Sequence, residues 1–588
     1  MTKISTLIRN HYLAIICFFV VGAFSIAPQF LAIKSLGSEY RGIPFFYVND
    51  NIFYTVRIQE ILDGHGWVNA PYIFEYKNLP SLVLPIGEYF YAIPAFVLGL
   101  SAAETAVLFN GFLLPAILFF LVYLLMCKLT KVVDFRGRIN AIACGLLVIL
   151  SLDLPALKIV WAIVSDQYKH AAYLSWVRPV NPITGAILLF CFLLLLWSLV
   201  NSNNNKRRIY SGVMAGMVLS LMVGYFFSWG TAASVWAVLM FVFLLKKDWL
   251  TARAIFFVGL LGFGLLLPYF YRVFSVGIGQ EGLASASYGM SFTHQPVFNK
   301  ILTLALLIFL PTFFYECLSR KKNGEKLGRV WWFCLSFILG GFIALNQQII
   351  TGRTVWYYHF SQYTAPLAIV AAMVPLYLVF KSKLPRIILV MNFLVILVFF
   401  VYGTAVAKSY KYGVEGMREL QKYHAVLSWL RVNGEKDCVV LIKENKEEKL
   451  AFLIPAFTQC NVYMTNLFGL SSVPLERAKH NSMIWMALSG ATAENAERFL
   501  RENLQWSGTH YTGDWKESLS RMPDKKFKET VKQVAAEYRA FLGKDFLTEL
   551  KKYKIDYLMS EDPLSVTLVK QFGFARLVGE FGPVYVYQ

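Results

Sequence analysis

The stretch FYVNDNIFYTVRIQEILDGHG, residues 46–66, is the most polar and most regularly patterned part of the apolar portion of the chain. A helix over about residues 51–62 fits this stretch. Asn49 or Asp50 can cap its start, because short polar side chains accept hydrogen bonds from the first turn. Gly64 can end the helix just past its last turn.

Three polar side chains of the expected helix share one face. Asp50, Tyr54 and Arg57 are spaced i, i+4 and i+7, which places them on the same side. The helix thus offers a carboxylate, a phenol and a guanidinium together at the edge of an apolar segment. From this stretch alone, Asp50 is explained equally well as a functional carboxylate or as a helix cap with no further role.

The composition indicates a polytopic α-helical membrane protein. Of the 588 residues, 57% are hydrophobic and only 16% are charged. The apolar residues form runs of about 20, which is the length that spans the hydrocarbon core of a bilayer. The first run is long and lacks a small-residue cleavage site after it, so we expect a retained span rather than a signal peptide.

The positive charge of the chain indicates membrane orientation and not nucleic-acid binding. Residues 1–407 hold 30 Lys and Arg against 14 Asp and Glu, whereas residues 408–588 hold 26 against 22. The excess lies between the apolar runs, where basic residues mark cytoplasmic loops. Placing these basic loops in the cytoplasm predicts eleven spans, with the N-terminus inside and the C-terminal part outside. The expected spans are residues 12–33, 104–127, 139–157, 183–201, 209–228, 230–245, 254–275, 299–317, 330–349, 363–380 and 387–407.

One further apolar run, residues 82–100, does not fit as a span. Counting it as one would move the later basic loops to the wrong side of the membrane, and it carries Glu88, Pro85 and Pro94. We therefore expect a helix that lies against the outer membrane surface. It closes a first outward loop over residues 34–103.

The chain changes character after residue 407, which predicts a transmembrane domain over residues 1–407 and a soluble extracytoplasmic α/β domain over residues 408–588. The segments CVVLI, AFLIPAF and NVYM are expected to be buried strands, and KIDYLMS a later one. The closing stretch ARLVGEFGPVYVYQ predicts a hairpin. Helices are expected near residues 418–433, 484–505 and 527–553.

The outward domain holds two of the eight cysteines, Cys438 and Cys460. A disulfide between them fits an oxidising compartment, and two free buried thiols are the alternative. The other six lie in or next to spans, where Cys behaves as a small apolar residue.

The long connections all face outward in this topology and carry the remaining candidate residues. Asp166 and Arg178 lie in the second outward loop, Glu281 in the third, and Arg353 and His359 in the fourth. Arg178 can bind a phosphate or extend to lipid headgroups. Elaborate loops on one face of a helical scaffold favour an active site there.

The layout and the opening motif resemble the GT-C superfamily of membrane glycosyltransferases. NDNIFYTVRIQEIL is similar to the first-loop motif of oligosaccharyltransferase catalytic subunits, in which an Asp is followed by aromatics, an Arg and a Glu. The run 82–100 is similar to the juxtamembrane helix of protein O-mannosyltransferases and aminoarabinose transferases. By this resemblance Asp50 takes the place of the catalytic acidic residue. Tyr54, Arg57 and Glu60 follow it on the helix and are expected to bind substrate.

The resemblance implies sugar transfer from a polyprenyl-phosphate donor at the outer face of a membrane, which we expect to be the bacterial cytoplasmic membrane. A glycan, a lipid or a protein could be the acceptor. An Arg could bind the departing phosphate, with Arg353 as the first choice and Arg178 and Arg57 behind it, and His359 lies beside Arg353 in the same loop. A transporter or flippase for a lipid-linked glycan is the alternative function.

The resemblance also raises the possibility of a metal site at Asp50. Asp166 and Glu281 could join Asp50 around a divalent ion such as Mg²⁺ or Mn²⁺, but their loops match only by location. Asn49 and Asn51 flank Asp50, so a DxD motif is absent. No motif of the WWDYG type occurs after residue 408, and protein N-glycosylation is therefore not implied.

Overall fold

The computed structural model describes residues 2–46, 49–132, 134–277, 290–443, 449–465, 471–503 and 524–588, with side chains of the first-loop helix described from Asn51 onward. The chain forms two compact units. Unit 1 comprises Met1–Ser35, Ala106–Phe270 and Thr293–Glu415. Unit 2 comprises Leu36–Thr105, Tyr271–Phe292 and Gly416–Gln588, so it contains the first expected outward loop together with the C-terminal part.

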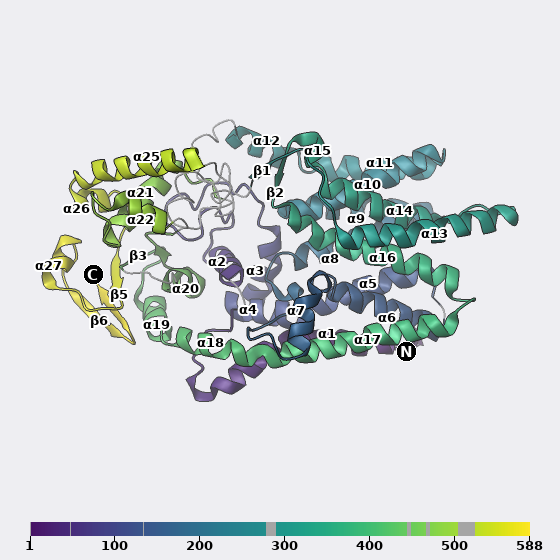
Figure 1. Cartoon of the computed structure of the whole chain (residues 1–588), viewed down its shortest axis with the longest axis horizontal. Helices are drawn as coiled ribbons and strands as arrows, with labels where there is room; N and C mark the ends of the chain where they lie inside the picture. The colour runs from purple at the N-terminus through teal and green to yellow at the C-terminus, as the bar shows by residue number, and fades with distance from the viewer. Residues whose placement is uncertain are drawn as a thin grey trace. The chain divides into compact units, whose positions relative to one another are not determined.

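Unit 1 is a bundle of long apolar helices that run side by side (Figure 1). The long helices are α1 (Thr2–Leu36), α5 (Leu114–Thr130), α6 (Phe135–Ile149), α8 (Ile183–Asn201), α9 (Asn205–Leu221), α10 (Phe226–Leu245), α11 (Trp249–Gly264), α13 (Lys300–Lys322), α14 (Arg329–Leu345), α16 (Ser361–Phe380) and α17 (Pro385–Lys408). Shorter helices of this unit are α7 (Leu157–Val164) and α15 (Gln348–Thr351). The bounds of α4 (Ala102–Leu108) and α12 (Leu267–Gly277) include residues of both units, and α4 continues into α5, so that Ala102–Thr130 is one membrane-length helix.

Within the described residues, eight helices are long and apolar enough to cross a membrane, and nine if the bent pair α11 and α12 forms one span. The chain is thus an integral membrane protein, as its composition indicates. Eleven spans were expected from the sequence. The two stretches that fall short of the length test are helical, but α6 has only 15 residues and α9 only 17.

Helix α6 nevertheless runs from one end of its neighbour α16 to the other. Asp134 at its start is hydrogen-bonded to Tyr377 near the end of α16. Ser151, just past its end, lines the same cavity as Ser361 at the start of α16. The segment from Asp134 to Ser151, which consists of the 15-residue helix α6 and the turn after it, therefore extends along most of the 20-residue helix α16.

Helix α9 likewise runs from one end of its neighbour α8 to the other. Arg208 near its start donates a hydrogen bond to the carbonyl of Ser202, directly after α8. Ser228, shortly after α9, lies against Gly185 at the start of α8. Both short helices are thus antiparallel neighbours of membrane-length helices.

Two helices of unit 2 come from the first loop, α2 (Asn49–Leu62) and α3 (Ile86–Leu98). Gly64 lies just past α2 with a φ of +96°, a conformation that suits glycine and ends the helix as its position predicts. α3 has 13 residues and is about 20 Å long, too short to cross a bilayer. It exposes an apolar face made of Ile93, Phe96, Val97 and Leu98.

The rest of unit 2 is an α/β fold built on a five-stranded sheet in the order β4-β3-β5-β7-β6. The strands are β3 (Val439–Ile442), β4 (Asn461–Val462), β5 (Tyr557–Ser560), β6 (Leu577–Phe581) and β7 (Val584–Tyr587). β3 pairs in parallel with β4 and β5, whereas β7 is antiparallel to β5 and β6. The expected closing hairpin is confirmed as β6 and β7, with Gly582 at its turn.

Helices cover both faces of the sheet (Figure 1). Side chains of β3 alternate between the faces, so Val440 belongs to one core and Leu441 to the other. The first core is closed by α2, α19 (His424–Asn433) and α20 (Lys449–Phe457), and the second by α21 (Leu475–Leu488), α22 (Ala496–Glu502) and α25 (Asp524–Leu542). The remaining helices of the C-terminal part are α18 (Val414–Gln421), α26 (Phe546–Leu550) and α27 (Val566–Gln571).

The expectation that AFLIPAF is a strand was wrong, because these residues lie in helix α20. The chain must travel back along the sheet between the parallel strands β3 and β4, and a helix is the usual crossover connection. The run is apolar all round because α20 is buried between the sheet and α2, where both cover it.

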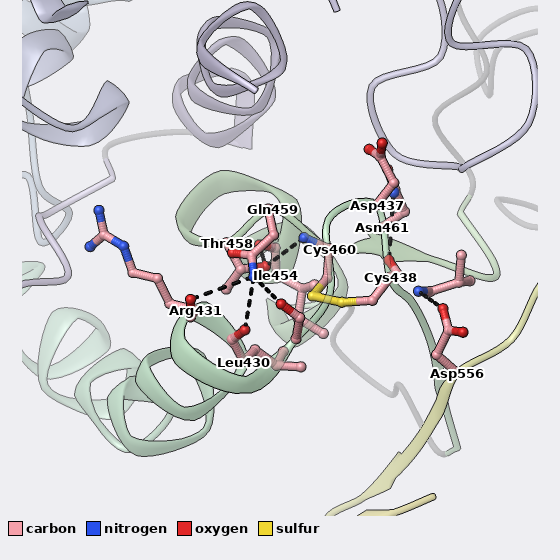
Figure 2. The surroundings of a disulfide bond; sticks show 12 residues. Leu430, Arg431, Asp437, Cys438, Ile454, Thr458, Gln459, Cys460, Asn461 and Asp556 are labelled. Atoms are coloured by element: carbon pink, nitrogen blue, oxygen red, sulfur yellow. Dashed lines mark hydrogen bonds between the residues drawn. A yellow bond between two sulfur atoms is a disulfide. The ribbon is translucent and has the colours of Figure 1, made fainter. Parts of the chain in front are cut away.

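A disulfide joins Cys438 and Cys460 beside the edge of this sheet (Figure 2). The neighbouring Gln459 side chain donates hydrogen bonds to the carbonyls of Leu430 and Gly434, at distances of 3.2 and 2.6 Å. Leu430 lies in the last turn of α19 and Gly434 directly follows the helix, and the Leu430 carbonyl also accepts a hydrogen bond from the N–H of Gly434. Gln459 thus attaches the end of α19 to the segment before β4, whereas the disulfide joins the residues that directly precede β3 and β4.

Candidate functional site

Unit 1 contains a cavity of about 540 Å³ at one end of its helix bundle. Nine of its fourteen lining residues are polar, although it lies among membrane helices. The lining residues are Ser151, Leu152, Tyr173, Ser175, Arg178, Pro182, Phe298, Asn299, Lys300, Ile301, Tyr358, Ser361, Gln362 and Ala365. Polar groups among membrane helices commonly mark a substrate site or pathway.

The starts of three long helices meet at this cavity. Pro182 precedes α8, Asn299 caps α13 and Ser361 begins α16, and all three line the cavity. The N-terminal end of a helix carries partial positive charge. The arrangement therefore favours an anionic ligand.

Two cationic side chains, Arg178 and Lys300, add to this positive character. The guanidinium of Arg178 donates to the carbonyl of Asn181 at 2.7 Å, which holds it near the start of α8. The described lining of the cavity includes no carboxylate. A planar guanidinium and an ammonium beside helix N-termini suit a phosphate group.

Hydrogen bonds between helices fix the polar wall of the cavity. The amide of Asn299 donates to the hydroxyl of Ser361 at 3.1 Å and thereby joins the starts of α13 and α16. Ser175 donates to the carboxylate of Asp153 at 2.9 Å. Because these groups are already held in place, a ligand would not have to order them on binding.

His359 and Arg353 do not line the cavity, although their loop contributes Tyr358. His359 lies among aromatic rings, with its Nδ1 atom 2.7 Å from the hydroxyl of Tyr225 and its ring stacked on Trp356. Arg353 begins the short strand β2 (Arg353–Val355) and is exposed. Of the three arginines proposed for phosphate binding, the structure brings only Arg178 into the cavity.

The opening motif lies in unit 2. Asp50 falls in the first turn of α2, and its side chain lies outside the described residues. Tyr54 is half-buried and its ring packs edge-on against that of Phe53. The helix itself packs on α20 through Ile52 and Val56, which belong to the core of unit 2.

Arg57 and Glu60 each form an ion pair in the interior of unit 2. The Nε atom of Arg57 lies 2.5 Å from Oε1 of Glu88 in α3, and the two side chains are 3% and 5% exposed. Glu60 accepts a hydrogen bond from the ammonium of Lys77, and both are equally buried. Burial raises the pKa of Glu60, while the charge of Lys77 opposes the shift.

The expected metal ligands are not brought together within the described part of the chain. Asp166 is exposed and binds the ammonium of Lys411 and the hydroxyl of Tyr412, each at 3.1 Å. These two hydrogen bonds lower the pKa of Asp166. Glu281 and the Asp50 side chain lie outside the described residues, and no group of three potential ligands occurs within them. The metal site therefore stays a prediction.

Lys300, Asn299 and Lys77 were not among the residues predicted from the sequence, and Glu88 was considered only as a charge that disfavours a span. The pair Asn299 and Lys300 directly precedes an apolar run, which is the position of a helix cap followed by a charged first turn. This local pattern could have identified both residues from the sequence. The partners of Arg57 and Glu60 are 31 and 17 residues away, and no local pattern predicts such pairs.

No protein-family model matches the chain, and no curated protein matches it in sequence. Solved structures do match in fold. The chain is 12% identical to the oligosaccharyltransferase of Archaeoglobus fulgidus tethered to an acceptor peptide, over 94% of this chain and 70% of that one, with a TM-score of 0.47. It is 13% identical to AglB from the same organism in complex with an inhibitory peptide and a dolichol-phosphate, over 93% and 69% of the two chains, with a TM-score of 0.46.

A third match is ArnT from Cupriavidus metallidurans bound to undecaprenyl phosphate, which is 10% identical over 100% of this chain and 98% of that one, with a TM-score of 0.47. These matches to oligosaccharyltransferases and to ArnT cover most of this chain.

Proposed function

We propose that the protein is a membrane glycosyltransferase that moves a sugar from a polyprenyl-phosphate donor to an acceptor hydroxyl. The observation that carries the proposal is the cavity of unit 1, where Arg178 and Lys300 join the starts of three membrane helices. A lipid phosphate needs this combination of positive charge and apolar surroundings. The resemblance of the opening motif to glycosyltransferase first loops supports the same chemistry.

In the proposed reaction the acceptor oxygen attacks the anomeric carbon of the donor sugar. The bond between that carbon and the phosphate oxygen breaks, and polyprenyl phosphate leaves with the bonding electrons. Asp50 accepts the proton of the acceptor hydroxyl. Arg178 and Lys300 offset the charge that develops on the leaving phosphate. A single displacement of this kind inverts the anomeric centre.

Arg178 replaces Arg353 as the first choice for the phosphate contact, because Arg178 lines the cavity and Arg353 does not. Tyr54 and His359 stay candidates for contacts with substrate. A divalent cation near Asp50, with Asp166 or Glu281, stays a proposal. Asp166 would have to release Lys411 and Tyr412 in order to bind it.

We place unit 2 on the extracytoplasmic side of the membrane, with the N-terminus of the chain in the cytoplasm. The Cys438–Cys460 disulfide supports this placement, because disulfides persist in oxidising compartments. The exposed apolar face of α3 supports contact of the first loop with the membrane surface. Leu98 at its end is only four residues before Ala102, where a membrane-length helix begins.

Transfer by the purified full-length chain tests the proposal. Undecaprenyl phosphate carrying one labelled sugar at a time is the donor, an extract of cell-envelope glycans is the acceptor, and release of undecaprenyl phosphate is measured. We expect release by the natural protein and none above background by Asp50→Ala. Glu39→Gln, which changes an exposed carboxylate with no role in the proposed site, is the control and should keep normal release. An Asp50→Ala protein with normal release would overturn the assignment. Movement of the lipid across vesicles without transfer would support the transporter instead.

A further inference from the structure

We propose that Arg57 and Glu60 are positioning residues, which set the direction of α2 through their buried ion pairs with Glu88 and Lys77. The inference rests on the proposed function, because it concerns how the chain holds the N-terminal turn of α2 that carries Asp50. It gives Arg57 and Glu60 a role different from the direct substrate contacts that the opening motif suggests.

The burial of both pairs is the first observation. All four side chains are at most 5% exposed, and the partners come from two separate segments, α3 and the loop before it. A substrate could reach these groups only by displacing their partners. Leaving a buried charge without its partner is strongly unfavourable, so such an exchange would oppose binding.

The placement of the pairs on the helix is the second observation. Arg57 and Glu60 are three residues apart, so they project from adjacent faces about 60° apart. One pair therefore limits the tilt of α2 toward α3, and the other limits rotation about its axis. The apolar contacts of Ile52 and Val56 with the core are less directional and do not set rotation by themselves.

The distance along α2 from Arg57 to Asp50 determines how far a tilt of the helix would move Asp50. Arg57 lies seven residues along the helix from Asp50, about 10 Å at 1.5 Å per residue. A tilt of about 10° around Arg57 would move the N-terminal turn by roughly 2 Å. A displacement of about 1 Å at a reacting group can lower a rate about a hundredfold.

The exposed apolar face of α3 offers a contact between this part of the chain and the membrane. Glu88 lies in the first turn of α3 and is buried, whereas Phe96, Val97 and Leu98 on its last turn are exposed. A helix anchored in lipid by that face would carry its ion pair to Arg57 at a fixed depth. The pair thus links the position of α2 to the membrane surface.

Steady-state transfer kinetics with charge variants of this pair test the proposal. Arg57→Glu and Glu88→Arg each place like charges together, and the double variant restores opposite charges in exchanged positions. We expect each single variant to lower kcat by about tenfold or more with an unchanged KM for the donor. The kcat of the double variant should be higher than that of either single variant. Glu88→Gln, which keeps the shape of the side chain, serves where the reversed charges prevent folding.

The matched control is Arg418→Gln. Arg418 pairs through its Nε atom with Glu39 at 2.6 Å in the same unit, but the two side chains are 40% and 55% exposed. We expect its kcat to stay within about twofold of the natural protein, because exposed pairs contribute little. A raised donor KM with unchanged kcat in the Arg57 variants, and no recovery in the double variant, would show direct binding and overturn the inference.

Hydrogen–deuterium exchange over residues 51–62 separates failure of this inference from failure of the proposed function. Positioning predicts faster exchange of α2 in the single variants and recovery in the double variant, whether or not any sugar is transferred. A natural protein without transfer would count against the proposed function. Unchanged exchange in the single variants would count against positioning.

Discussion

Among the described residues, the two units differ in whether cationic side chains are buried in ion pairs. In unit 2, Arg57, Lys77 and Arg477 are 1–5% exposed and each is paired with a glutamate. Within the described residues of unit 1, every arginine or lysine in an ion pair is at least 36% exposed. Buried pairs are costly to break and so hold an architecture, whereas accessible cations can exchange partners with a ligand. The predictions below test this division.

The largest effect on stability is expected at Arg477. It is 1% exposed, lies 3.4 Å from Glu75, donates to the carbonyl of Tyr463 at 2.8 Å and packs over the ring of Tyr553. Arg477→Met should lower the free energy of unfolding of unit 2 by about 3–4 kcal/mol, because it leaves buried acceptors unpaired. Chemical denaturation followed by tryptophan fluorescence measures this change. A loss below about 1 kcal/mol, the value for an exposed pair, would remove the distinction between the units.

The disulfide should contribute slightly less than Arg477 to the free energy of unfolding of unit 2. It closes a loop with a sequence separation of 22 residues, and loss of such a cross-link costs about 3 kcal/mol through the entropy of the unfolded chain. Cys438→Ser with Cys460→Ser should therefore lower the denaturation midpoint of unit 2. Unit 1 should respond little to reducing agent, since its described cysteines are free. Equal sensitivity of both units to reduction would contradict the prediction.

A smaller and pH-dependent effect is expected at His480. Burial, with a contribution from Arg477, lowers the pKa of His480 to about 4 from an ordinary value near 6.5. The unfolded chain therefore binds this proton first, and the stability that neutral His480 contributes is present above pH 6.5 and lost as the pH falls toward 4. Lowering the pH from 7 to 5 should cost about 1–2 kcal/mol.

Comparison with His480→Gln isolates this residue from other titrating groups. The difference in unfolding free energy between the two proteins should narrow by that amount between pH 7 and pH 5. A constant difference across the range would show that His480 has the same pKa in the folded and unfolded states.

Local patterns in the sequence predicted much of this fold. Capping residues and Gly64 bounded α2 within two residues, and the charge of the loops excluded residues 82–100 as a span. The hairpin β6 and β7 followed from a glycine between two β-rich runs. These features depend on neighbours in the chain, which a sequence displays directly.

Features that depend on distant neighbours were not predicted. AFLIPAF was expected to be a strand, because a short buried run has the same composition in a strand or in a helix covered on all sides. The partners of Arg57 and Glu60 and the role of Lys300 follow from tertiary packing. The sequence suggested three arginines for the phosphate, and only the packing of α8, α13 and α16 distinguishes Arg178 from the others.

Binding of undecaprenyl phosphate to the purified full-length chain tests the central claim most directly. Native mass spectrometry can compare this lipid with uncharged undecaprenol in the natural protein, Arg178→Gln and Arg353→Gln. We predict preference for the phosphate, loss of about tenfold or more in affinity in Arg178→Gln, since a charge-assisted hydrogen bond contributes about 1.5–3 kcal/mol, and little change in Arg353→Gln. Equal binding of undecaprenol, or an Arg178→Gln protein with full affinity, would contradict the account.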